Sequence, residues 1–414
     1  MSIYQKLHAL GESGKAIRIG VIGAGQMGFG MISQLTLIKG IEVRAICSKF
    51  GFTAQKAKVA YLNSGLKHHE IFVSKSLKEV IHHPDVDIVV DCTGIPDVGA
   101  QICLACLEAK KHIVMVNVEM DITIGTLMYH RFKDAGLVYT GSDGDEPACT
   151  FELIEFAKAI GFEVLAAGKG KNNKIRLQAN PDSVLEEATR RGMAAHMLAS
   201  FADGTKTMAE MTLLSNATGM IPDIPGMHGT KGNLEETLQQ LRLKSEGGVL
   251  DKYGVVEFVD GLAPGVFAIV KSENPHVVHE INYMMLSQGD RQILYRPFHL
   301  GSLETPLTIA KVYFNREFAI APLCGPISDT VCVAKKDIKA GEILDGIGGY
   351  CVRGWIELHK VVREKKLIPI GLIEGNTYAK RDIPNGTVLT EDDVSVDTST
   401  FIYRLRQEQD KIYG

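Results

Sequence analysis

Short runs of β-branched residues alternate with stretches whose apolar residues recur at helical spacing through the first 150 residues. The run AIRIGVI at residues 16–22 has the uniform apolar character of a buried parallel strand, and MGFGMISQLTLI after the next turn has helical spacing. Four further runs read as strands: IEVRAIC at 41–47, VDIVVDCTG at 86–94, HIVMVNVEM at 112–120 and GLVYTGSDGDEP at 136–147. Repeated strand–helix units predict an α/β fold with an N-terminal Rossmann-type parallel sheet.

The pattern changes in the middle of the chain and again near its end. A helix is expected over residues 148–160, followed by an apolar strand in FEVLAAG. Near the C-terminus, AKKDIKAGEILDG (334–346) recurs as AKRDIPNGTVLTE (379–391). Each copy predicts a strand, a glycine turn and a second short strand, and two copies are too few for a solenoid. We therefore expect a dinucleotide-binding domain over 1–150, an α+β catalytic and dimerisation domain over 151–300, and a small β-rich module over 326–414.

The glycine-rich stretch VIGAGQMGFG at residues 21–30 lies between the first strand and its helix. Gly23, Gly25 and Gly28 fit the G-x-G-x-x-G spacing, in which the first glycine permits the turn, the second admits a pyrophosphate and the third packs helix on strand. The helix start, including Gln26 and Met27, would then offer N–H groups to the phosphates. The context favours a dinucleotide site over a plain strand–helix turn.

The end of the second strand bears on the choice of cofactor. An NAD-binding sheet usually carries a carboxylate there for the ribose 2′-hydroxyl, but this chain has Cys47, Ser48 and Lys49. Because Lys49 could pair with a 2′-phosphate, we expect NADP(H) rather than NAD(H). The alternative is that Lys49 is simply solvated.

Polar residues follow the later strands at the edge of the sheet where ligands bind in such folds. These candidates for cofactor or substrate contacts are Thr93, Gly94, Asn117, Glu119, Asp143, Asp145 and Glu146. Their alternative role is to cap turns and helices, which Asp, Asn and Thr commonly do.

The stretch GKGKNNKIRL gathers hydrogen-bond donors directly after the apolar strand. We expect Lys169, Lys171 and Lys174 with Asn172 and Asn173 to form a loop. Clustered lysines repel one another unless an anion lies among them, so the cluster favours a phosphorylated substrate or a carbonyl awaiting a proton. A solvated surface loop is the alternative.

Two later segments add candidates. In SFADGTKTMAEM, Asp203 and Lys206 lie three residues apart at a helix start, where the carboxylate could orient the lysine. In YRPFHLGSLETP, Arg296 and His299 could bind substrate, although a lone histidine is more often structural.

Composition excludes several classes of function. The chain has 414 residues, a formal net charge of −4 and 45% hydrophobic residues, which gives no basic surface for nucleic acid and no apolar run long enough for a membrane. The eight cysteines are scattered, and Cys103 and Cys106 lie in an expected helix without a second pair to complete a zinc site. We expect a cytoplasmic homo-oligomer that acts on a small molecule.

The motifs DCTGIP, VNVE, GSDGDEP, AAGKGKNN, SFADGTK and YRPFHLGSLETP together resemble the homoserine dehydrogenase-like oxidoreductases, within them the 1-deoxy-D-xylulose 5-phosphate reductoisomerase-like branch. The resemblance implies that residues 169–173, Asp203 and Lys206 hold substrate beside the nicotinamide, and that residues 301–325 return to the first domain. The N-G-T-T-N loop of homoserine dehydrogenases is replaced here by GKGKNN. The second copy of the C-terminal repeat resembles the SAF domain.

These features predict an NADPH-dependent oxidoreductase on a small phosphorylated hydroxy-carbonyl compound. Lys169 or Lys206 is expected to protonate the developing oxyanion, with Asp203 as its orienting partner. Lys171, Asn172, Asn173, Arg296 and His299 would bind substrate, and Glu119 or Asp145 would transfer a proton. The resemblance implies rearrangement and reduction of 1-deoxy-D-xylulose 5-phosphate to 2-C-methyl-D-erythritol 4-phosphate, which a divalent metal on Asp145 and Glu146 would assist.

Three alternatives remain open at this point. The chain could be a dehydrogenase of homoserine or of another polyol phosphate. It could be a non-enzymatic NADP(H) sensor, or an assembly or carbohydrate-binding protein in which the SAF-like part is the working end.

Overall fold

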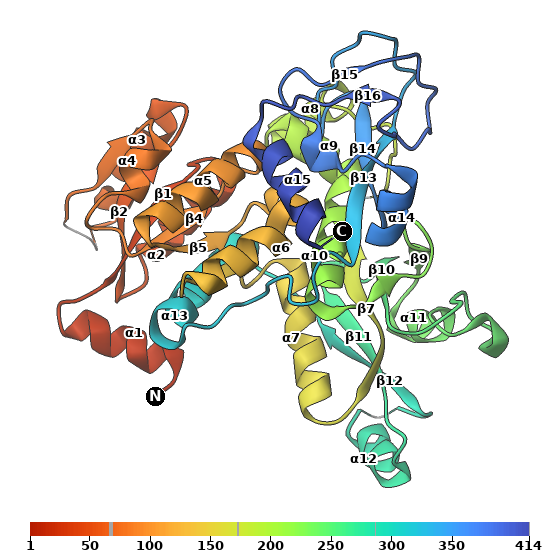
Figure 1. Ribbon diagram of the computed structural model, residues 1–414. Helices are drawn as coiled ribbons and strands as arrows, with labels where there is room; N and C mark the ends of the chain where they lie inside the picture. The colour runs from red at the N-terminus through yellow and green to blue at the C-terminus, as the bar shows by residue number, and fades with distance from the viewer. Residues whose placement is uncertain (66–68, 172–173, 286, 414) are drawn as a thin grey trace. The chain divides into compact units, whose positions relative to one another are not determined.

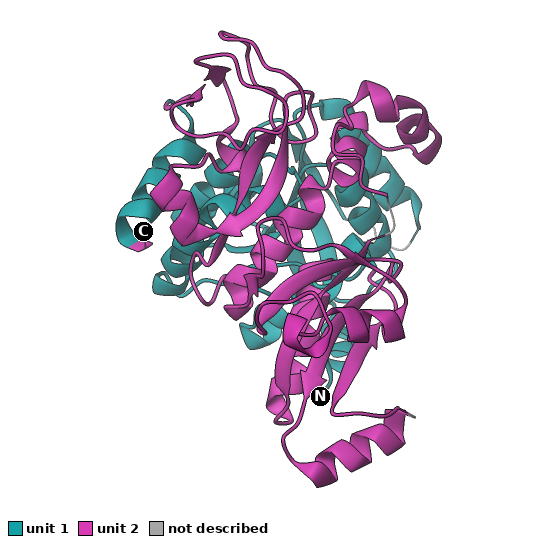
Figure 2. Ribbon diagram, turned by 90° about the vertical axis from the view of Figure 1, so that its right-hand side faces the viewer, with its two compact units in different colours: residues 1–145, 300–321, 399–412 teal, residues 146–299, 322–398, 413–414 magenta. Residues whose placement is uncertain are grey.

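The computed structural model describes residues 1–65, 69–171, 174–285 and 287–413 (Figure 1). The chain divides into two compact units (Figure 2). Unit 1 comprises Met1–Asp145, Leu300–Ala321 and Ser399–Ile412, and unit 2 comprises Glu146–His299 and Pro322–Thr398 with the last residues of the chain. The sequence pattern places residues 326–414 in a part of their own, whereas the structure groups most of them with Glu146–His299.

Unit 1 is built on a parallel sheet. Its strands are β1 (Ile17–Ile22), β2 (Ile41–Cys47), β3 (Phe72–Ser74), β4 (Ile88–Asp91), β5 (His112–Met115) and β6 (Tyr139–Gly141), in the order β3-β2-β1-β4-β5-β6. Every neighbouring pair is parallel. This order is the one found in dinucleotide-binding sheets, with its topological switch point between β1 and β4. The predicted Rossmann-type fold is confirmed.

The helices of unit 1 come from three parts of the chain. They are α1 (Ile3–Glu12), α2 (Gln26–Leu35), α3 (Gly51–Asn63), α4 (Leu77–Ile81), α5 (Pro96–Ala109), α6 (Val118–Asp134), α13 (Thr305–Asn315) after the 3-10 turn η3 (Gly301–Leu303), and α15 (Phe401–Tyr413). The expectation of one strand over residues 112–120 is wrong, because the strand ends at Met115. The side chain of Asn117 accepts a hydrogen bond from the N–H of Met120 and begins α6 there.

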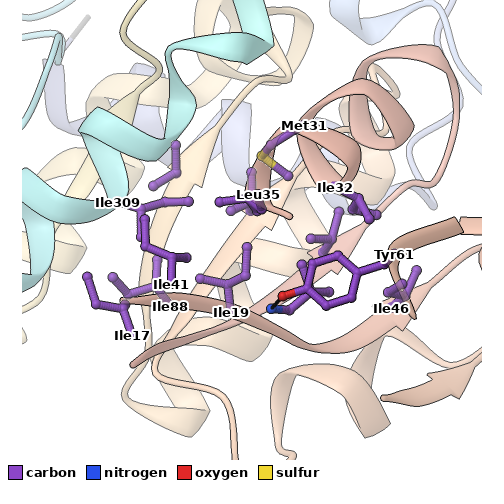
Figure 3. Packing of buried hydrophobic residues seen from close by; sticks show 14 of the residues in the cluster. Ile17, Ile19, Met31, Ile32, Leu35, Ile41, Ile46, Tyr61, Ile88 and Ile309 are labelled. Atoms are coloured by element: carbon purple, nitrogen blue, oxygen red, sulfur yellow. Dashed lines mark hydrogen bonds between the residues drawn. The ribbon is translucent and has the colours of Figure 1, made fainter. Parts of the chain in front are cut away.

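Isoleucines from β1, β2 and β4 make the centre of the unit 1 core (Figure 3). Ile17 and Ile19 are fully buried, and Ile309 of α13 packs in the same cluster although it lies far along the chain. The Tyr61 hydroxyl accepts a hydrogen bond of 3.3 Å from the N–H of Val43, so this large side chain is buried without an unsatisfied oxygen. Residues after 300 are therefore part of the core that supports the glycine turn.

Unit 2 contains a mixed sheet. Its strands are β7 (Glu163–Lys171), β8 (Ile221–Pro222), β9 (Thr230–Lys231), β10 (Val255–Asp260), β11 (Val266–Lys271) and β12 (Arg291–Arg296), in the order β12-β11-β7-β10-β8 with β9 paired to β10. The helices are α7 (Glu146–Ala159), α8 (Leu185–Arg191), α9 (Ala195–Ala202), α10 (Thr205–Thr218), α11 (Leu234–Gln240) and α12 (Pro275–Met285), with 3-10 turns η1 (Asp182–Val184) and η2 (Lys244–Glu246). Both α7 and α10 contact β7, which places side chains of all three elements close together.

The C-terminal part of unit 2 is β-rich, as predicted. An antiparallel hairpin joins β13 (Ser328–Ala334) and β14 (Val352–Leu358), followed by α14 (His359–Lys365), the 3-10 turn η4 (Ile370–Leu372) and a short pair, β15 (Tyr378–Ala379) and β16 (Val394–Ser395). The two repeat copies pair with each other through a bridge between Ile338 and Ile383. In the described part of the chain, no helix combines the length and the apolar character needed to cross a membrane.

Candidate active site

The glycine turn after β1 has the geometry of a dinucleotide cradle. Gly23 has φ +96°, and a Cβ added there would lie 2.7 Å from the Cys92 carbonyl oxygen, while one on Gly28 would lie 2.0 Å from the Gly23 carbonyl oxygen. A Cβ on Gly25 would meet only open space. Gly25 is also the N-cap of α2 and has no side chain to cap the helix, so the first turn, at Gln26 and Met27, presents its N–H groups to a ligand. The turn therefore fits the pyrophosphate of a dinucleotide.

The loop after β4 is ordered by a buried carboxylate. Asp91 accepts hydrogen bonds from the N–H (2.8 Å) and hydroxyl (2.6 Å) of Thr93 and from the side-chain amide of Asn117 (3.0 Å). Burial raises the pKa of Asp91 to about 6. The buried amide of Asn117 also donates to the Ile95 carbonyl and orders this loop, and its contact with a cofactor stays a prediction. Gly94 follows with φ +64°, and a Cβ there would lie 4.0 Å from a carboxylate oxygen of Glu119.

The end of β2 carries both signs of charge. Lys49 is exposed, and the Ser48 hydroxyl lies 2.6 Å from that of Thr53. Glu79 accepts a hydrogen bond of 2.6 Å from the Ser74 side chain at the end of β3. Burial of Cys47 and, to a smaller extent, the negative charge of Glu79 raise the pKa of Cys47 to about 11. A carboxylate from α4 thus lies near the end of β2, where the residues 47–49 themselves supply none.

In unit 2, the residues of the GKGK sequence at the end of β7 alternate between the two faces of the sheet. Lys169 and Lys171 are two residues apart and point to one face of the sheet. Gly168 and Gly170 occupy the other face, where added Cβ atoms would lie 1.7 Å from the Glu257 carbonyl oxygen and 2.2 Å from the Leu262 carbonyl carbon. The expectation of a loop over Lys169 and Lys171 is wrong: both lysines lie on the strand and are only 6% exposed.

Lys169 is held by two carboxylates. Its ammonium donates to Glu146 of α7 at 2.6 Å and also to Glu210 of α10. Burial alone would lower the pKa of Lys169, but the charges of Glu146 and Glu210 outweigh it and raise the pKa above its ordinary value. Although burial opposes it, Lys169 in turn lowers the pKa of Glu146 to about 2. A lysine that holds its proton this firmly is a poor proton donor, so the structure speaks against Lys169 as the acid.

Lys171 lies in a different environment on the same strand. Its ammonium donates to the Phe201 carbonyl at 3.0 Å and to the Thr207 hydroxyl at 3.3 Å, neither of which is charged. Burial, and then the positive charge of Lys169, lower the pKa of Lys171 to about 8. Lys171, expected from the sequence to bind substrate, is therefore the described lysine of this cluster best suited to exchange a proton near neutral pH.

The expected pairing of Asp203 with Lys206 needs revision. Asp203 accepts a 2.8 Å hydrogen bond from Lys335 of the C-terminal part and a 2.9 Å bond from the N–H of Thr205. Asp203 is 1% exposed, and its ionic partner is Lys335, which lies much later in the chain in the C-terminal part of unit 2. Lys206 is half-buried at the start of α10, and its charge acts on Glu210.

The two basic residues of the YRPFH segment lie near α7. His299 Nε2 is 3.3 Å from Glu146 Oε1, so it joins the group around Lys169. Arg296 donates to Cys149 Sγ at 3.0 Å and to Glu152 at 3.2 Å, and it lies over the Phe298 ring. Arg296 is thus directed toward α7 residues by these contacts. Asn172 and Asn173 lie outside the described residues.

Glu210 is the functional candidate that the sequence pattern does not reveal. It is 1% exposed in α10, and burial, followed by the charge of Glu146, raises its pKa. Its signal in the sequence is a single carboxylate in the otherwise uncharged run MAEMTLL. Carboxylate oxygens of Glu146 and Glu210 lie within 4.8 Å of each other, and Asp145 directly precedes Glu146 in the chain. Carboxylate oxygens would suit a hard cation, but the single Lys169 ammonium already pairs with both Glu146 and Glu210 and offsets one of their two negative charges.

Three family models match successive parts of the chain. They are the N-terminus of dihydrodipicolinate reductase at residues 17–117, the catalytic domain of oxidoreductase DRL at residues 144–305 and the SAF domain at residues 329–395. The predicted SAF resemblance is confirmed. The predicted resemblance to homoserine dehydrogenases and to 1-deoxy-D-xylulose 5-phosphate reductoisomerase is wrong, because the models that match are those of dihydrodipicolinate reductase, oxidoreductase DRL and the SAF domain. Polar motifs after parallel strands recur across Rossmann oxidoreductases, so they indicate the fold better than the substrate.

Individual relatives are similar over only part of their length. The chain is 26% identical over 110 residues to glycosyl hydrolase family 109 protein 1 of Shewanella sp. strain MR-4, and 25% identical over 112 residues to an alpha-N-acetylgalactosaminidase of Shewanella oneidensis. It spans 24% of each of these relatives and aligns over 26% and 27% of its own length, respectively.

Two solved structures are similar to the chain at low identity. A probable dehydrogenase of Thermotoga maritima is similar over 74% of this chain and 91% of its own, with a TM-score of 0.43 and 17% identity. The oxidoreductase yvaA of Bacillus subtilis is similar over 74% and 92%, with a TM-score of 0.39 and 13% identity. The two oxidoreductase family models, one of them on the sheet with the fitting glycine turn, support an NAD(P)-dependent oxidoreductase.

Proposed function

We propose that the chain interconverts a carbonyl and a hydroxyl group on a small anionic substrate, with Lys171 as the residue that gives or takes the proton. The observation that carries this proposal is the contrast between two lysines on one face of β7. Lys169 is fixed as a cation by two carboxylates, whereas Lys171 has uncharged partners and a pKa of about 8.

A bound nicotinamide supplies or accepts the hydride in such a reaction. In the direction of reduction, the Lys171 ammonium donates a proton to the oxygen that becomes negatively charged, and in the direction of oxidation, neutral Lys171 takes the hydroxyl proton. Lys169 keeps a positive charge beside this oxygen at every working pH, because Glu146 and Glu210 hold its proton. A fixed positive charge in a buried site stabilises a developing oxyanion.

We further propose that the substrate carries a phosphate or a similar anion. Lys174 is exposed just beyond the strand that carries Lys169 and Lys171. Lys206 is half-buried in the first turn of α10, and its charge lowers the pKa of Glu210 on the same helix against the effect of burial. An exposed cation just beyond the strand and a second cation in the first turn of α10 favour an anionic substrate. The substrate class is thus a phosphorylated hydroxy or carbonyl compound.

NADP(H) is proposed as the preferred cofactor on the strength of Lys49. This lysine is exposed at the end of β2, where it could pair with a 2′-phosphate. Glu79 opposes this preference, because its carboxylate lies near Cys47, where it would repel a 2′-phosphate or accept a hydrogen bond from a ribose hydroxyl. The preference therefore depends on which of the two charges is closer to the ribose.

The test is turnover with NADPH and with NADH against phosphorylated ketoses and aldoses and their unphosphorylated counterparts. Lys171→Met is expected to lower kcat by about 100-fold or more without changing affinity for NADPH, since a general acid contributes about that much. Lys174→Met is the matched control, because it removes a nearby exposed lysine and should raise KM with little change in kcat. Full turnover in Lys171→Met, once a substrate is in hand, would exclude Lys171 as the proton donor.

A further inference from the structure

The C-terminal repeat contains a buried lysine that reaches the catalytic part of unit 2. Lys335 donates to Asp203 Oδ2 at 2.8 Å and to the Ala179 carbonyl at 2.7 Å. The two charged side chains are 1% and 0% exposed. Removal of one partner from a buried ion pair leaves an uncompensated charge, so this contact constrains both segments strongly.

Asp203 passes this constraint to the segment that holds Lys171. Its other carboxylate oxygen accepts the N–H of Thr205, the first residue of α10, at 2.9 Å. The Lys171 ammonium donates to the Phe201 carbonyl and to the Thr207 hydroxyl, which lie on either side of Asp203 in the chain. From β14, the N–H of Gly354 donates to the Thr205 hydroxyl at 2.8 Å, so a second contact from the C-terminal part fixes the same turn.

We propose that Lys335 is a positioning residue for Lys171, and that it acts through Asp203 and the turn of residues 201–207. This inference rests on the proposed function, because it gives the SAF-type part of the chain the task of placing the proposed proton donor. The SAF-type part is then a component of the oxidoreductase rather than a separate binding module.

The repeat itself provides an internal comparison. Lys335 and Lys380 occupy the same place in the two copies of A-K-x-D-I. Lys380 is exposed and donates to the Glu391 carbonyl at 2.8 Å. The motif alone therefore does not require a buried lysine, and the burial of Lys335 belongs to its contact with Asp203.

The charges around Lys171 indicate what loss of Lys335 should do. The positive charge of Lys169 on β7 lowers the pKa of Lys171, after burial, whereas the charges of Glu210 on α10, Asp203 and Glu146 on α7 raise it. A buried carboxylate without a counter-ion takes up a proton. Without Lys335, the buried Asp203 keeps its charge interaction with Arg353 of β14 but is protonated more easily, so one of the three charges that raise the pKa of Lys171 is weakened.

The experiment measures kcat against pH for the full-length Lys335→Met variant in the direction of reduction. We expect kcat to fall by about 10-fold, KM for the nicotinamide cofactor to stay the same, and the limb assigned to Lys171 to move to lower pH by about half a unit or more. Lys335→Arg should recover part of kcat, because a guanidinium can still pair with Asp203. Lys380→Met is the matched control and should leave the profile unchanged.

If Lys335 has a purely structural role, Lys335→Met lowers the melting temperature but leaves the pH at which kcat falls unchanged, and that result would overturn the inference. A shift of this midpoint to higher pH would overturn it as well. If Lys335→Met does not fold, Asp203→Asn tests the same point, since its amide oxygen can still accept from Thr205 while the charge is gone. Failure of the proposed function looks different, because Lys171→Met would then retain full turnover. If Lys171 is essential but its limb ignores Lys335 and Asp203, only the present inference fails.

Discussion

Replacement of Lys169 by Met should destabilise unit 2 in a pH-dependent way. The Lys169 ammonium lies 2.6 Å from Glu146, and it also holds Glu210. At an effective dielectric constant of about 20, unit charges at that distance attract each other by about 6 kcal/mol. Desolvation of the wild-type lysine offsets part of this attraction, so we expect a net loss of about 3–5 kcal/mol in the free energy of unfolding at pH 8. For a unit of this size, that loss corresponds to a fall of about 6–20 °C in Tm.

The sign of the pH effect follows from the carboxylates. In the wild-type protein the pKa of Glu146 is lowered to about 2 from 4.5, so its stabilising contribution is present above pH 4.5 and is lost as the pH falls through 2. Without Lys169, burial and mutual repulsion would raise the folded-state pKa of both carboxylates, opposed only in part by the charges of His299 on Glu146 and of Lys206 on Glu210. They would then bind protons in the folded variant, and the loss of stability should be smaller at pH 5 than at pH 8.

The measurement is thermal and denaturant unfolding of wild-type protein and of Lys169→Met at pH 5 and pH 8. Lys158→Met is the control, because it makes the same substitution at an exposed position in α7. A loss below about 1 kcal/mol, the range of an exposed ion pair, would show that the buried charge pairing has been misjudged. An equal loss at both pH values would refute the assignment of the effect to Glu146 and Glu210.

Three further predictions concern proton transfer and the cofactor. Turnover in the direction of reduction should fall as the pH rises through about 8, because burial lowers the pKa of Lys171 to that value and the neutral amine cannot donate; a midpoint above 10 would contradict this. Gly25→Val should abolish binding of NADPH and NADH in calorimetry, because its side chain would fill the space of the pyrophosphate, while Tm changes little because that space is otherwise open. Gly28→Ala should instead lower Tm, because its Cβ would lie 2.0 Å from the Gly23 carbonyl oxygen. Lys49→Ala should raise KM for NADPH more than KM for NADH, and Glu79→Gln should do the reverse. Equal effects of Lys49→Ala on both cofactors would show that Lys49 does not bind the 2′-phosphate.

The Rossmann sheet could be predicted because its determinants are local. Uniform apolar runs fix the buried strands at residues 17–22 and 41–47, and the G-x-G-x-x-G spacing needs only a strand before it and a helix after it. The strand expected over residues 112–120 fails for a local reason as well: hydrophobicity continues past Met115, but the side chain of Asn117 begins a helix. Apolar content alone cannot distinguish a buried strand from a buried helix start.

The environment of the lysines could not be predicted because its determinants are far apart in the chain. A run of lysines and asparagines favours a loop, yet Lys169 and Lys171 continue β7. Their burial depends on Glu210 of α10, on the Phe201 carbonyl and on close approach of the neighbouring strand to Gly168. None of these contacts can be predicted from the residues around the GKGK sequence. The pairing of Asp203 with Lys335 likewise joins residues that are far apart in the chain.

The two lysines of β7 show how one strand can present the same side chain for two different tasks. Residues two apart on a strand share a face, so sequence spacing alone gives Lys169 and Lys171 similar surroundings. The surrounding helices make them different, because α7 and α10 direct their carboxylates to Lys169 and leave Lys171 with a carbonyl and a hydroxyl. The fixed charge of Lys169 then helps to lower the pKa of its neighbour. Under the proposed function, a lysine that stays charged beside a lysine with a lowered pKa would serve proton transfer to a developing oxyanion.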